Sequence, residues 1–236
     1  MTISVTPIFI PGLILTRDIF AKQIDGLVHP AAAKTADTLG RDSITAMAEA
    51  ALALADGPLV PVGISMGGYI AMEMARLAPQ RLAGIALFNT QHRADPPERR
   101  KQREATIDMA QSDRFRGVTR HLLKSFLSPA AMEDETLVAR VIAMAEEVGR
   151  ENFVLQQRAI LGRRDQSDTL GALTVPALVL GGGLDTLTPP QASRDMAELI
   201  PDAELVIMEE IGHLSTIEAP DEVTDILNAY LARLAA

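Results

Sequence analysis

The sequence contains no cysteine and no tryptophan, and only two tyrosines and six phenylalanines among its 236 residues. Without cysteine the chain can form neither a disulfide nor a thiolate metal site, and it cannot use a cysteine nucleophile. Because aromatic residues are scarce, the core must be built mainly from Leu, Ile, Val, Ala and Met. The lack of disulfides is compatible with a reducing compartment.

Long hydrophobic runs are also absent from the sequence. No stretch approaches the roughly 20 apolar residues that a transmembrane helix requires. The first twelve residues contain neither a basic segment nor a small-residue cleavage pattern, so they do not resemble a signal peptide. We therefore expect a cytoplasmic protein that does not associate with a membrane.

The formal net charge of −9 argues against general nucleic-acid binding, which depends on Lys and Arg side chains that neutralise phosphates. Positive charge is nevertheless concentrated between residues 92 and 124, which hold nine basic and five acidic residues. This pattern fits a solvated helical face. Alternatively, it could dock an acidic partner such as an acyl carrier protein or a coenzyme A tail. The basic residues are Arg93, Arg99, Arg100, Lys101, Arg103, Arg114, Arg116, Arg120 and Lys124.

Short apolar runs alternate with amphipathic stretches over much of the chain, which is typical of a parallel sheet flanked by helices. Strands are expected at 3–10, 59–64, 82–88, 177–180 and 204–208, with a weaker candidate at 26–32. Helices are expected at 18–24, 42–55, 66–77, 191–200 and 220–234. The chain length suits one large α/β domain.

The alternation stops between residues 91 and 168, where only charged amphipathic helical segments are found. They are interrupted at Pro96-Pro97, at Ser128-Pro129 and at Gly149. We therefore predict an α/β core formed by residues 1–90 and 169–236, with residues 91–168 inserted as a helical lid. Such a lid would cover the carboxyl ends of the strands, where open α/β sheets bind their ligands.

The most specific motif is Gly63-Ile64-Ser65-Met66-Gly67, which stands between an expected strand and an expected helix. A sharp strand-to-helix turn requires small residues two positions before and after the serine. It would expose the Ser65 hydroxyl and place the Met66 N–H at a helix N-terminus, where it could stabilise an oxyanion. A chance match in a glycine-rich turn is the alternative. We predict that Ser65 is a nucleophile.

A serine nucleophile needs a base to take its proton, and the sequence offers four histidines. Only His213 follows a late strand through a glycine and lies downstream of Ser65. His29 and His121 are expected to be structural. His92, just past the strand at 82–88, is a candidate to border the substrate pocket.

The histidine in turn needs an acid that fixes its tautomer. Asp185 lies in the loop after the strand at 177–180, between Ser65 and His213, which gives the order serine, acid, histidine. Other acids occupy a helix, a turn or positions beside the histidine, where they are better interpreted as solvated charges. These competitors are Asp195, Asp202, Glu209 and Glu210.

The loop after the first strand is expected to supply a second oxyanion donor, the N–H of Leu13. Gly12 would let the backbone approach closely and contact the substrate, although an ordinary strand-end turn is the alternative. Apolar residues of the lid would either pack on the core or line an acyl pocket, with Phe126 as a substrate contact. They are Met109, Phe115, Leu122, Leu123, Phe126, Leu127, Met132, Val141, Met144 and Phe153. No metal or organic cofactor is expected.

Together these motifs resemble the α/β-hydrolase superfamily over nearly the whole chain. They resemble most the small carboxylesterase-like members that are grouped with pimeloyl carrier-protein methyl ester esterases. The resemblance implies an α/β-hydrolase fold, with a mostly parallel sheet of about six strands flanked by helices and a helical lid. Relatives commonly have His-Gly where this chain has Pro11-Gly12, and the chain begins at what would be the family's third strand.

The function expected from this resemblance is hydrolysis of a carboxylic ester, thioester or lactone through an acyl-enzyme on Ser65. The same three side chains could instead support carbon–carbon bond hydrolysis or acyl transfer. A third hypothesis is a non-catalytic protein of the same fold that binds a small molecule. Serine at the nucleophile position argues against dehalogenase and epoxide hydrolase chemistry, which uses a carboxylate there in related enzymes.

Overall fold

The computed structural model describes residues 5–28, 33–112 and 117–234. In this part of the chain six strands form one parallel sheet in the order β2-β1-β3-β4-β5-β6. The prediction of a parallel sheet of about six strands is therefore confirmed. The strands are β1 (Thr6–Ile10), β2 (Lys34–Thr35), β3 (Leu59–Ile64), β4 (Ile85–Phe88), β5 (Ala177–Gly182) and β6 (Ala203–Met208).

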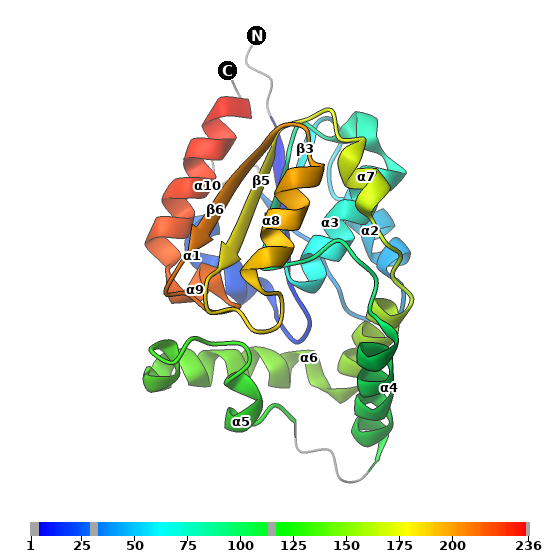
Figure 1. The fold of residues 1–236 in the computed structure, drawn as a ribbon, viewed down its shortest axis with the longest axis vertical. Helices are drawn as coiled ribbons and strands as arrows, with labels where there is room; N and C mark the ends of the chain where they lie inside the picture. The colour runs from blue at the N-terminus through cyan, green and yellow to red at the C-terminus, as the bar shows by residue number, and fades with distance from the viewer. Residues whose placement is uncertain (1–4, 29–32, 113–116, 235–236) are drawn as a thin grey trace.

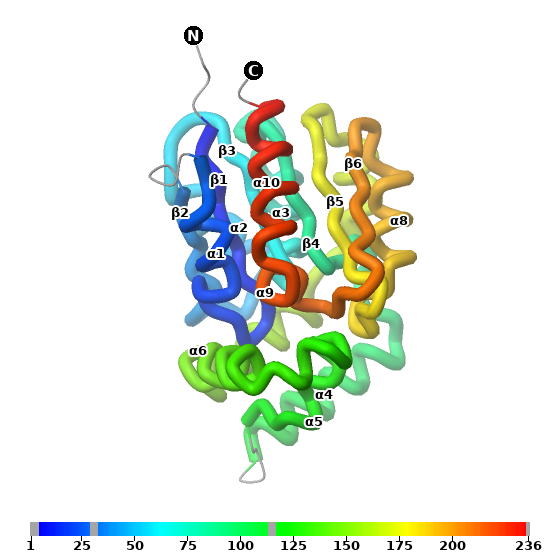
Figure 2. Tube along the Cα trace, turned by 90° about the vertical axis from the view of Figure 1, so that its left-hand side faces the viewer, coloured from blue at the N-terminus to red at the C-terminus, as the bar shows by residue number. Residues whose placement is uncertain are grey.

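Helices cover both faces of the sheet, as Figures 1 and 2 show. One face packs against α1 (Ala21–Asp25), α9 (Ser215–Glu218) and α10 (Pro220–Leu234), and the other against α2 (Ile44–Leu52), α3 (Met66–Leu77) and α8 (Pro190–Leu199). Successive side chains of a strand point to opposite faces. In β1, accordingly, Phe9 belongs to the first hydrophobic cluster, while Ile8 and Ile10 belong to the second.

One expected strand is misplaced, and another is shorter than predicted. The strand expected at 26–32 is wrong for residues 26–28, which form no strand, and the pairing with β1 is made by Lys34–Thr35. Leu27 is buried in the core from this segment, so its apolar character reflects packing and not strand pairing. Residues 29–32, with His29, lie outside the described residues. The strand expected at 82–88 begins only at Ile85.

The chain between β4 and β5 forms α4 (Pro97–Gln111), α5 (Arg120–Leu123), α6 (Glu135–Leu161) and α7 (Ser167–Gly171). Helices α4, α5 and α6 lie beyond the carboxyl ends of the strands, whereas α7 contacts α3 and α8 (Figure 1). Gly149 kinks α6 with a φ of +73°, which glycine adopts easily because it has no Cβ. The division of the chain at residues 90 and 168 stays a prediction.

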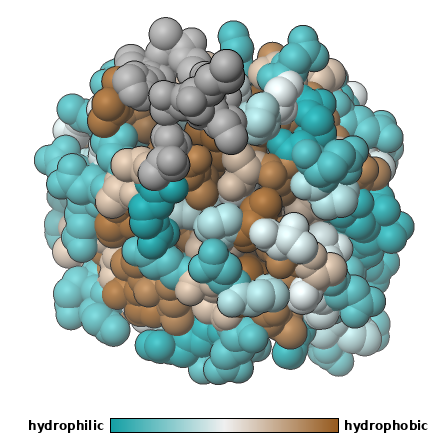
Figure 3. All heavy atoms as spheres, turned by 90° about the horizontal axis from the view of Figure 1, so that it is seen from above, coloured by the Kyte–Doolittle hydropathy of each residue, from teal (hydrophilic) through white to brown (hydrophobic). Residues whose placement is uncertain are grey.

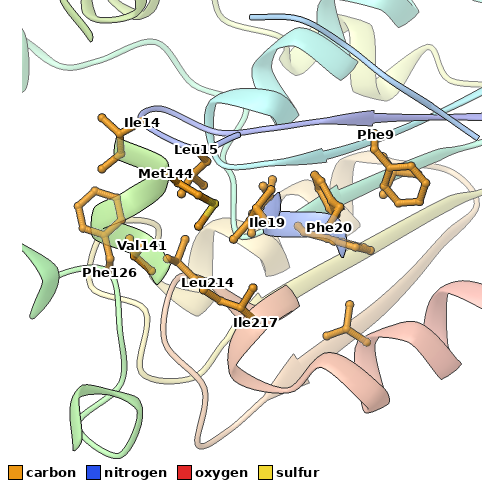
Figure 4. Packing of buried hydrophobic residues seen from close by; sticks show 14 of the residues in the cluster. Phe9, Ile14, Leu15, Ile19, Phe20, Phe126, Val141, Met144, Leu214 and Ile217 are labelled. Carbon is orange, nitrogen blue, oxygen red and sulfur yellow. The ribbon is translucent and has the colours of Figure 1, made fainter. Parts of the chain in front are cut away.

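Apolar side chains of this helical insertion pack directly on the core. Figure 4 shows Phe126, Val141 and Met144 close to Ile14 and Leu15 of the loop after β1. Seven of the ten apolar residues singled out in the insertion are buried in this cluster, whereas Met109 and Leu122 are exposed and Phe115 lies outside the described residues. Lid-to-core packing thus accounts for most of them. The buried seven are Leu123, Phe126, Leu127, Met132, Val141, Met144 and Phe153.

A buried ion cluster around Asp95 joins the two ends of the insertion. The fully buried Asp95 carboxylate accepts hydrogen bonds from Arg103 Nε and from Arg163 Nη2, each at 2.8 Å. Burial alone would raise the pKa of Asp95, but these two arginines lower it to about 2. Since Asp95 precedes α4 and Arg163 follows α6, the cluster holds together the base of the insertion.

Replacing Asp95 by asparagine is expected to lower the free energy of unfolding by about 3–5 kcal/mol, because buried guanidinium groups lose their counter-charge. Urea denaturation measures this change. Asp37→Asn is the matched control, since Asp37 is exposed and lies 3.9 Å from Arg41, and such surface pairs contribute about 1 kcal/mol or less. Equal losses in the two variants would contradict a stabilising role for the cluster.

Among the described residues, no helix is both long and apolar enough to cross a bilayer. Seen from the end opposite to α4–α6, the surface is hydrophilic around its rim and carries separate hydrophobic patches (Figure 3). Scattered apolar residues of this kind are normal on a protein surface.

Candidate active site

Ser65 occupies the turn between β3 and α3, as the sequence predicts. Its φ of +56° is a conformation that side chains other than glycine rarely adopt. The Ser65 N–H donates to the Phe88 carbonyl of β4 at 3.0 Å, and Thr90 Oγ1 donates to the Ser65 carbonyl at 2.8 Å. These bonds hold the strained turn, and the Ser65 side chain remains partly exposed.

The glycines around Ser65 are required by close backbone contacts. A Cβ on Gly63 would overlap the backbone of Gly67, and a Cβ on Gly67 would overlap the carbonyl group of Ile10. A Cβ on Gly12 would lie 3.1 Å from the Ser65 Cβ. The ends of β1 and β3 and the start of α3 therefore meet at Ser65, and Gly12 lies beside it.

The structure brings together the three residues that the sequence predicts as nucleophile, base and acid. The distance between His213 Nε2 and Ser65 Oγ is 2.9 Å, and that between His213 Nδ1 and Asp185 Oδ2 is 2.7 Å. Asp185 lies in the loop after β5, and His213 lies in the loop between β6 and α9. The competing acid Asp195 belongs instead to α8, where it pairs with Arg93.

The Asp185 carboxylate is saturated with hydrogen-bond donors. Its Oδ1 accepts the N–H groups of Leu187 and Thr188 at 2.8 and 2.9 Å. Its Oδ2 accepts Thr188 Oγ1 at 2.7 Å and Asn89 Nδ2 at 3.1 Å, in addition to the bond with His213. This network fixes the carboxylate at one position and orientation.

The same network lowers the pKa of the Asp185 carboxyl group. Burial alone would raise the pKa of Asp185, but the charge of His213 and the hydrogen bonds from His213 and Thr188 outweigh it, so that the pKa lies below its usual range. An ionised carboxylate only accepts hydrogen bonds, so His213 Nδ1 carries the proton in this bond. Its Nε2 is then free to accept the Ser65 hydroxyl.

Asn89 is a site residue that the sequence reasoning missed. It directly follows β4, has a φ of +44° and is fully buried. Its Nδ2 donates to Asp185 Oδ2 and to the Gly212 carbonyl, both at 3.1 Å, and its Oδ1 accepts Ser215 Oγ at 2.6 Å. A polar residue just after a strand, at the edge where ligands bind, is the signal that could have identified it.

The predicted oxyanion donors, the N–H groups of Leu13 and Met66, directly follow Gly12 and Ser65 in the chain, and their role stays a prediction. Among the described residues the Leu13 N–H has no acceptor, whereas the next N–H, of Ile14, donates to Gln156 Oε1 at 3.0 Å. Met66 is the first residue of α3, and N–H groups in a first helical turn lack intrahelical acceptors. Gln156 was missed because it lies in α6, far along the chain from Ile14.

The predicted substrate contacts separate into two regions. Phe126 lies beside His213, with ring centroids 5.8 Å apart in an edge-on arrangement, and its carbonyl accepts the His213 N–H at 2.9 Å. His92 instead lines a cavity beside α2 and α3, and its side chain bonds to Arg93. His121 is exposed on α5. A role for His92 in substrate binding stays a prediction.

Much of the predicted basic surface on α4 is used internally. Arg99 donates to the Leu187 carbonyl at 3.2 Å, Arg100 donates to the Leu161 carbonyl at 2.6 Å, and Arg103 binds Asp95. These guanidinium groups attach α4 to the rest of the molecule. Arg114 and Arg116 lie outside the described residues. Within the described ranges, no group of three or more acidic or histidine side chains is arranged to hold a metal ion.

Glu218 of α9 positions the loop that carries His213. Its Oε2 accepts the N–H groups of Gly212 and Ser128 at 3.1 and 3.0 Å, and its Oε1 accepts that of Leu214 at 3.2 Å. One carboxylate therefore binds the backbone on both sides of His213 and also the segment before α6. No local pattern around the histidine pointed to this residue.

Replacing Glu218 by alanine is expected to lower kcat by about 10- to 100-fold, because small displacements of a reacting group are costly. Steady-state kinetics on an activated ester measure this change. Glu222→Ala, at an exposed position in the first turn of α10, is the control and should retain activity. An unchanged kcat in Glu218→Ala would show that the loop holds its position without this carboxylate.

Comparison with known proteins identifies the family. A family model described as "alpha/beta hydrolase fold" matches residues 8–220. The dihydrolipoyllysine-residue acetyltransferase component of an acetoin cleaving system from Pseudomonas putida is 27% identical over 94% of this chain, which spans only 58% of that protein. The pimeloyl-[acyl-carrier protein] methyl ester esterase of Photobacterium profundum is 29% identical over 82% of this chain and 78% of that protein.

Solved structures agree on the fold. A thermophilic esterase from Thermogutta terrifontis, solved with malate bound, superimposes with a TM-score of 0.90 at 24% identity, covering 100% of this chain and 92% of that one. An enol-lactonase from Burkholderia xenovorans LB400 gives a TM-score of 0.81 at 22% identity, covering 97% and 92%. With a family model that matches most of its length, the chain belongs to the α/β-hydrolase fold family.

Proposed function

We propose that the chain is a serine hydrolase that cleaves a carboxylic ester, thioester or lactone of a small or medium acyl group through an acyl-enzyme on Ser65. The observation that carries the proposal is the continuous hydrogen-bonded series from Ser65 Oγ through His213 to Asp185. Relatives named as esterases and a structural neighbour named as a lactonase support ester bonds as the substrate class.

In the first half of the proposed cycle, His213 Nε2 takes the Ser65 hydroxyl proton while Oγ attacks the carbonyl carbon of the ester. The carbonyl electron pair moves to its oxygen, which the N–H groups of Met66 and Leu13 stabilise. When the carbonyl re-forms, the bond to the leaving oxygen or sulfur breaks. His213 Nε2–H gives its proton to that atom, and the alcohol or thiol leaves.

In the second half, His213 takes a proton from water, and the water oxygen attacks the acyl carbon. Collapse of this second tetrahedral species breaks the bond to Ser65 Oγ, which recovers its proton from His213. The carboxylic acid then leaves. Asp185 remains ionised throughout and stabilises the transient imidazolium.

We propose a small or medium acyl group because the side chains near these reacting atoms are apolar and closely packed. Ile14 follows Leu13 in the chain, and the Phe126 ring lies beside His213. Both belong to the same packed apolar cluster as Val141 and Met144, which favours a short apolar wall over a long open groove. We propose that Phe126 and the backbone at Gly12 contact the acyl group.

An acyl carrier protein as the substrate carrier is supported by the name of the Photobacterium relative, a pimeloyl-[acyl-carrier protein] methyl ester esterase. Because Arg99, Arg100 and Arg103 bind internal acceptors, neutralising them would disturb the insertion as well as any docking surface. The exposed Lys101 and Lys124 provide a cleaner test. If a carrier docks there, the double change to glutamine should reduce hydrolysis of carrier-linked methyl esters more than that of free esters, and equal effects would refute docking.

The proposed activity is tested with p-nitrophenyl esters of graded acyl length, together with a lactone and a 1,3-diketone. Saturable hydrolysis of the shorter esters, lost in Ser65→Ala, is expected. Cleavage of the diketone without ester hydrolysis would instead assign carbon–carbon bond hydrolysis to the same side chains. Inertness toward every substrate, with saturable binding of one of them, would indicate a binding protein.

A further inference from the structure

A polar cavity of about 120 Å³ lies beside the first turn of α2, the middle of α3 and the chain that follows α6. Its lining includes Ser43, Thr45, Tyr69, His92 and Arg163, but none of the three residues that converge at the proposed reaction site. The space is several times larger than the roughly 15 Å³ that one water molecule needs. It is a separate compartment with room for a small ligand.

Two residues of the lining, His92 and Arg163, each carry a buried nitrogen that has no hydrogen-bond partner in the described part of the chain. Arg93 Nε donates to His92 Nε2 at 3.3 Å, so the neutral ring carries its proton on Nδ1, and this N–H is unpartnered. The second is Arg163 Nε. Its guanidinium group is held 4.3 Å from the centre of the Tyr69 ring and bonded to Asp95. Only 3% of His92 and 7% of Arg163 is exposed.

The start of α2 adds further donors to the lining. Ser43 is its N-cap, and Ser43 Oγ accepts the Ala46 N–H at 3.4 Å. The N–H groups of Ile44 and Thr45 belong to the first turn, which has no intrahelical acceptors for them. The N-terminal end of a helix also carries partial positive charge that favours anions.

The acidic residues of the lining do not satisfy these donors. Glu73 accepts hydrogen bonds from Thr45 and Arg76 on Oε1, and from Arg76 and Gln166 on Oε2. Burial would raise the pKa of Glu73, but these bonds lower it to about 2, so the carboxylate is ionised and fully engaged with its own partners. Asp42 is exposed. The unpartnered groups around the cavity are therefore hydrogen-bond donors, and a ligand that binds them must supply acceptors.

We propose that this cavity is a binding site for a small oxyanion, a carboxylate or a phosphate group, held by His92 Nδ1–H, Arg163 Nε–H and the first turn of α2. A buried donor left without an acceptor is destabilising, and an anionic oxygen removes that penalty with a charge-assisted hydrogen bond. Since Arg163 also binds Asp95, the ligand would sit where the helical insertion joins the core.

Calorimetric titration of the whole chain with acetate and with inorganic phosphate, at an ionic strength held constant with chloride, tests the site. Saturable binding of at least one anion is expected, with Kd of about 1 mM or lower. His92→Gln, whose amide oxygen can replace Nε2 as the acceptor for Arg93 but which has no donor near Nδ1, should weaken it about tenfold or more. His92→Asn, with its amide nitrogen near Nδ1, should bind more tightly than His92→Gln. Lys22→Gln removes an exposed charge on α1 and should bind as the wild type does.

A second measurement needs no variant. In nitrogen NMR of the histidine rings, the anion that binds should shift the His92 resonances and leave those of the exposed His121 unchanged. An unshifted His92 ring, the absence of saturable binding by both anions, or equal affinity in His92→Gln and the wild type would each overturn the proposal. The relative affinities for acetate and phosphate decide which oxyanion the site prefers.

Discussion

Replacing Ser65 by alanine is expected to lower kcat for ester hydrolysis by about 10⁴- to 10⁶-fold while the protein stays folded. The change removes only one oxygen atom, and that oxygen forms the covalent bond in the proposed cycle. The backbone around it is held by bonds to Phe88 and Thr90 that do not use the side chain. Steady-state kinetics together with thermal unfolding separate the loss of chemistry from any loss of fold.

Ser193→Ala provides a matched control for this substitution. Ser193 is fully buried in α8, and its hydroxyl has no hydrogen-bond partner in the described ranges, so the change should leave both kcat and stability close to the wild type. A kcat within about tenfold of the wild type in Ser65→Ala would contradict the serine mechanism, since the loss of a covalent nucleophile lowers kcat far more than that.

Replacing Asp185 by asparagine is expected to lower kcat by about 10⁴-fold with little change in the fold. Asp185 Oδ1 accepts two backbone N–H groups, so the asparagine oxygen should remain there and its NH₂ group should face His213. The ring would then accept that N–H on Nδ1 and carry its own proton on Nε2. In this tautomer Nε2 has no lone pair to accept the Ser65 hydroxyl.

Asp195→Asn tests whether the loss of kcat is specific to the Asp185 carboxylate. Asp195 is a competing acid between Ser65 and His213 in the chain, but it lies on α8 and pairs with Arg93 at 3.6 Å. Its variant is expected to keep kcat within about twofold of the wild type, as surface substitutions usually have small effects. Equal losses in Asp185→Asn and Asp195→Asn would contradict the assigned acid.

The features that the sequence predicted correctly are local ones. The motif around Ser65 encodes a strand, a turn and a helix in consecutive residues, and β3 and α3 match their predicted bounds. Asp185 and His213 were recognised because each follows a strand, and parallel strands bring their carboxyl ends to one edge of the sheet. Strand β2 was misplaced because an edge strand of two residues carries almost no periodicity.

The features that could not be predicted depend on contacts between distant segments. Gln156 binds the loop after β1 from the middle of α6, and Glu218 binds the His213 loop together with Ser128, which is 90 residues away. The sequence predicts that the basic run on α4 is a surface, because nothing local reveals that Arg100 donates to the Leu161 carbonyl group. Side-chain partners of this kind follow from the tertiary fold and not from spacing.

Strained backbone conformations lie at the edge of the sheet formed by the carboxyl ends of the strands. Among the described residues, positive φ outside glycine occurs at Ile14, Ser65 and Asn89, which follow the neighbouring strands β1, β3 and β4. Such conformations cost about 1–3 kcal/mol each and persist where the surroundings fix them. These residues and the Asp185–His213–Ser65 series lie at the same edge of the sheet, which supports the proposal that the reaction takes place there.

Labelling with a fluorophosphonate tests the central claim most directly, since this reagent phosphonylates only a serine that a neighbouring base activates. Intact-mass measurement and peptide mapping should find one adduct, on Ser65, that forms within minutes and is absent from Ser65→Ala and His213→Ala. An unlabelled wild-type protein, or an adduct on a different serine, would contradict the account.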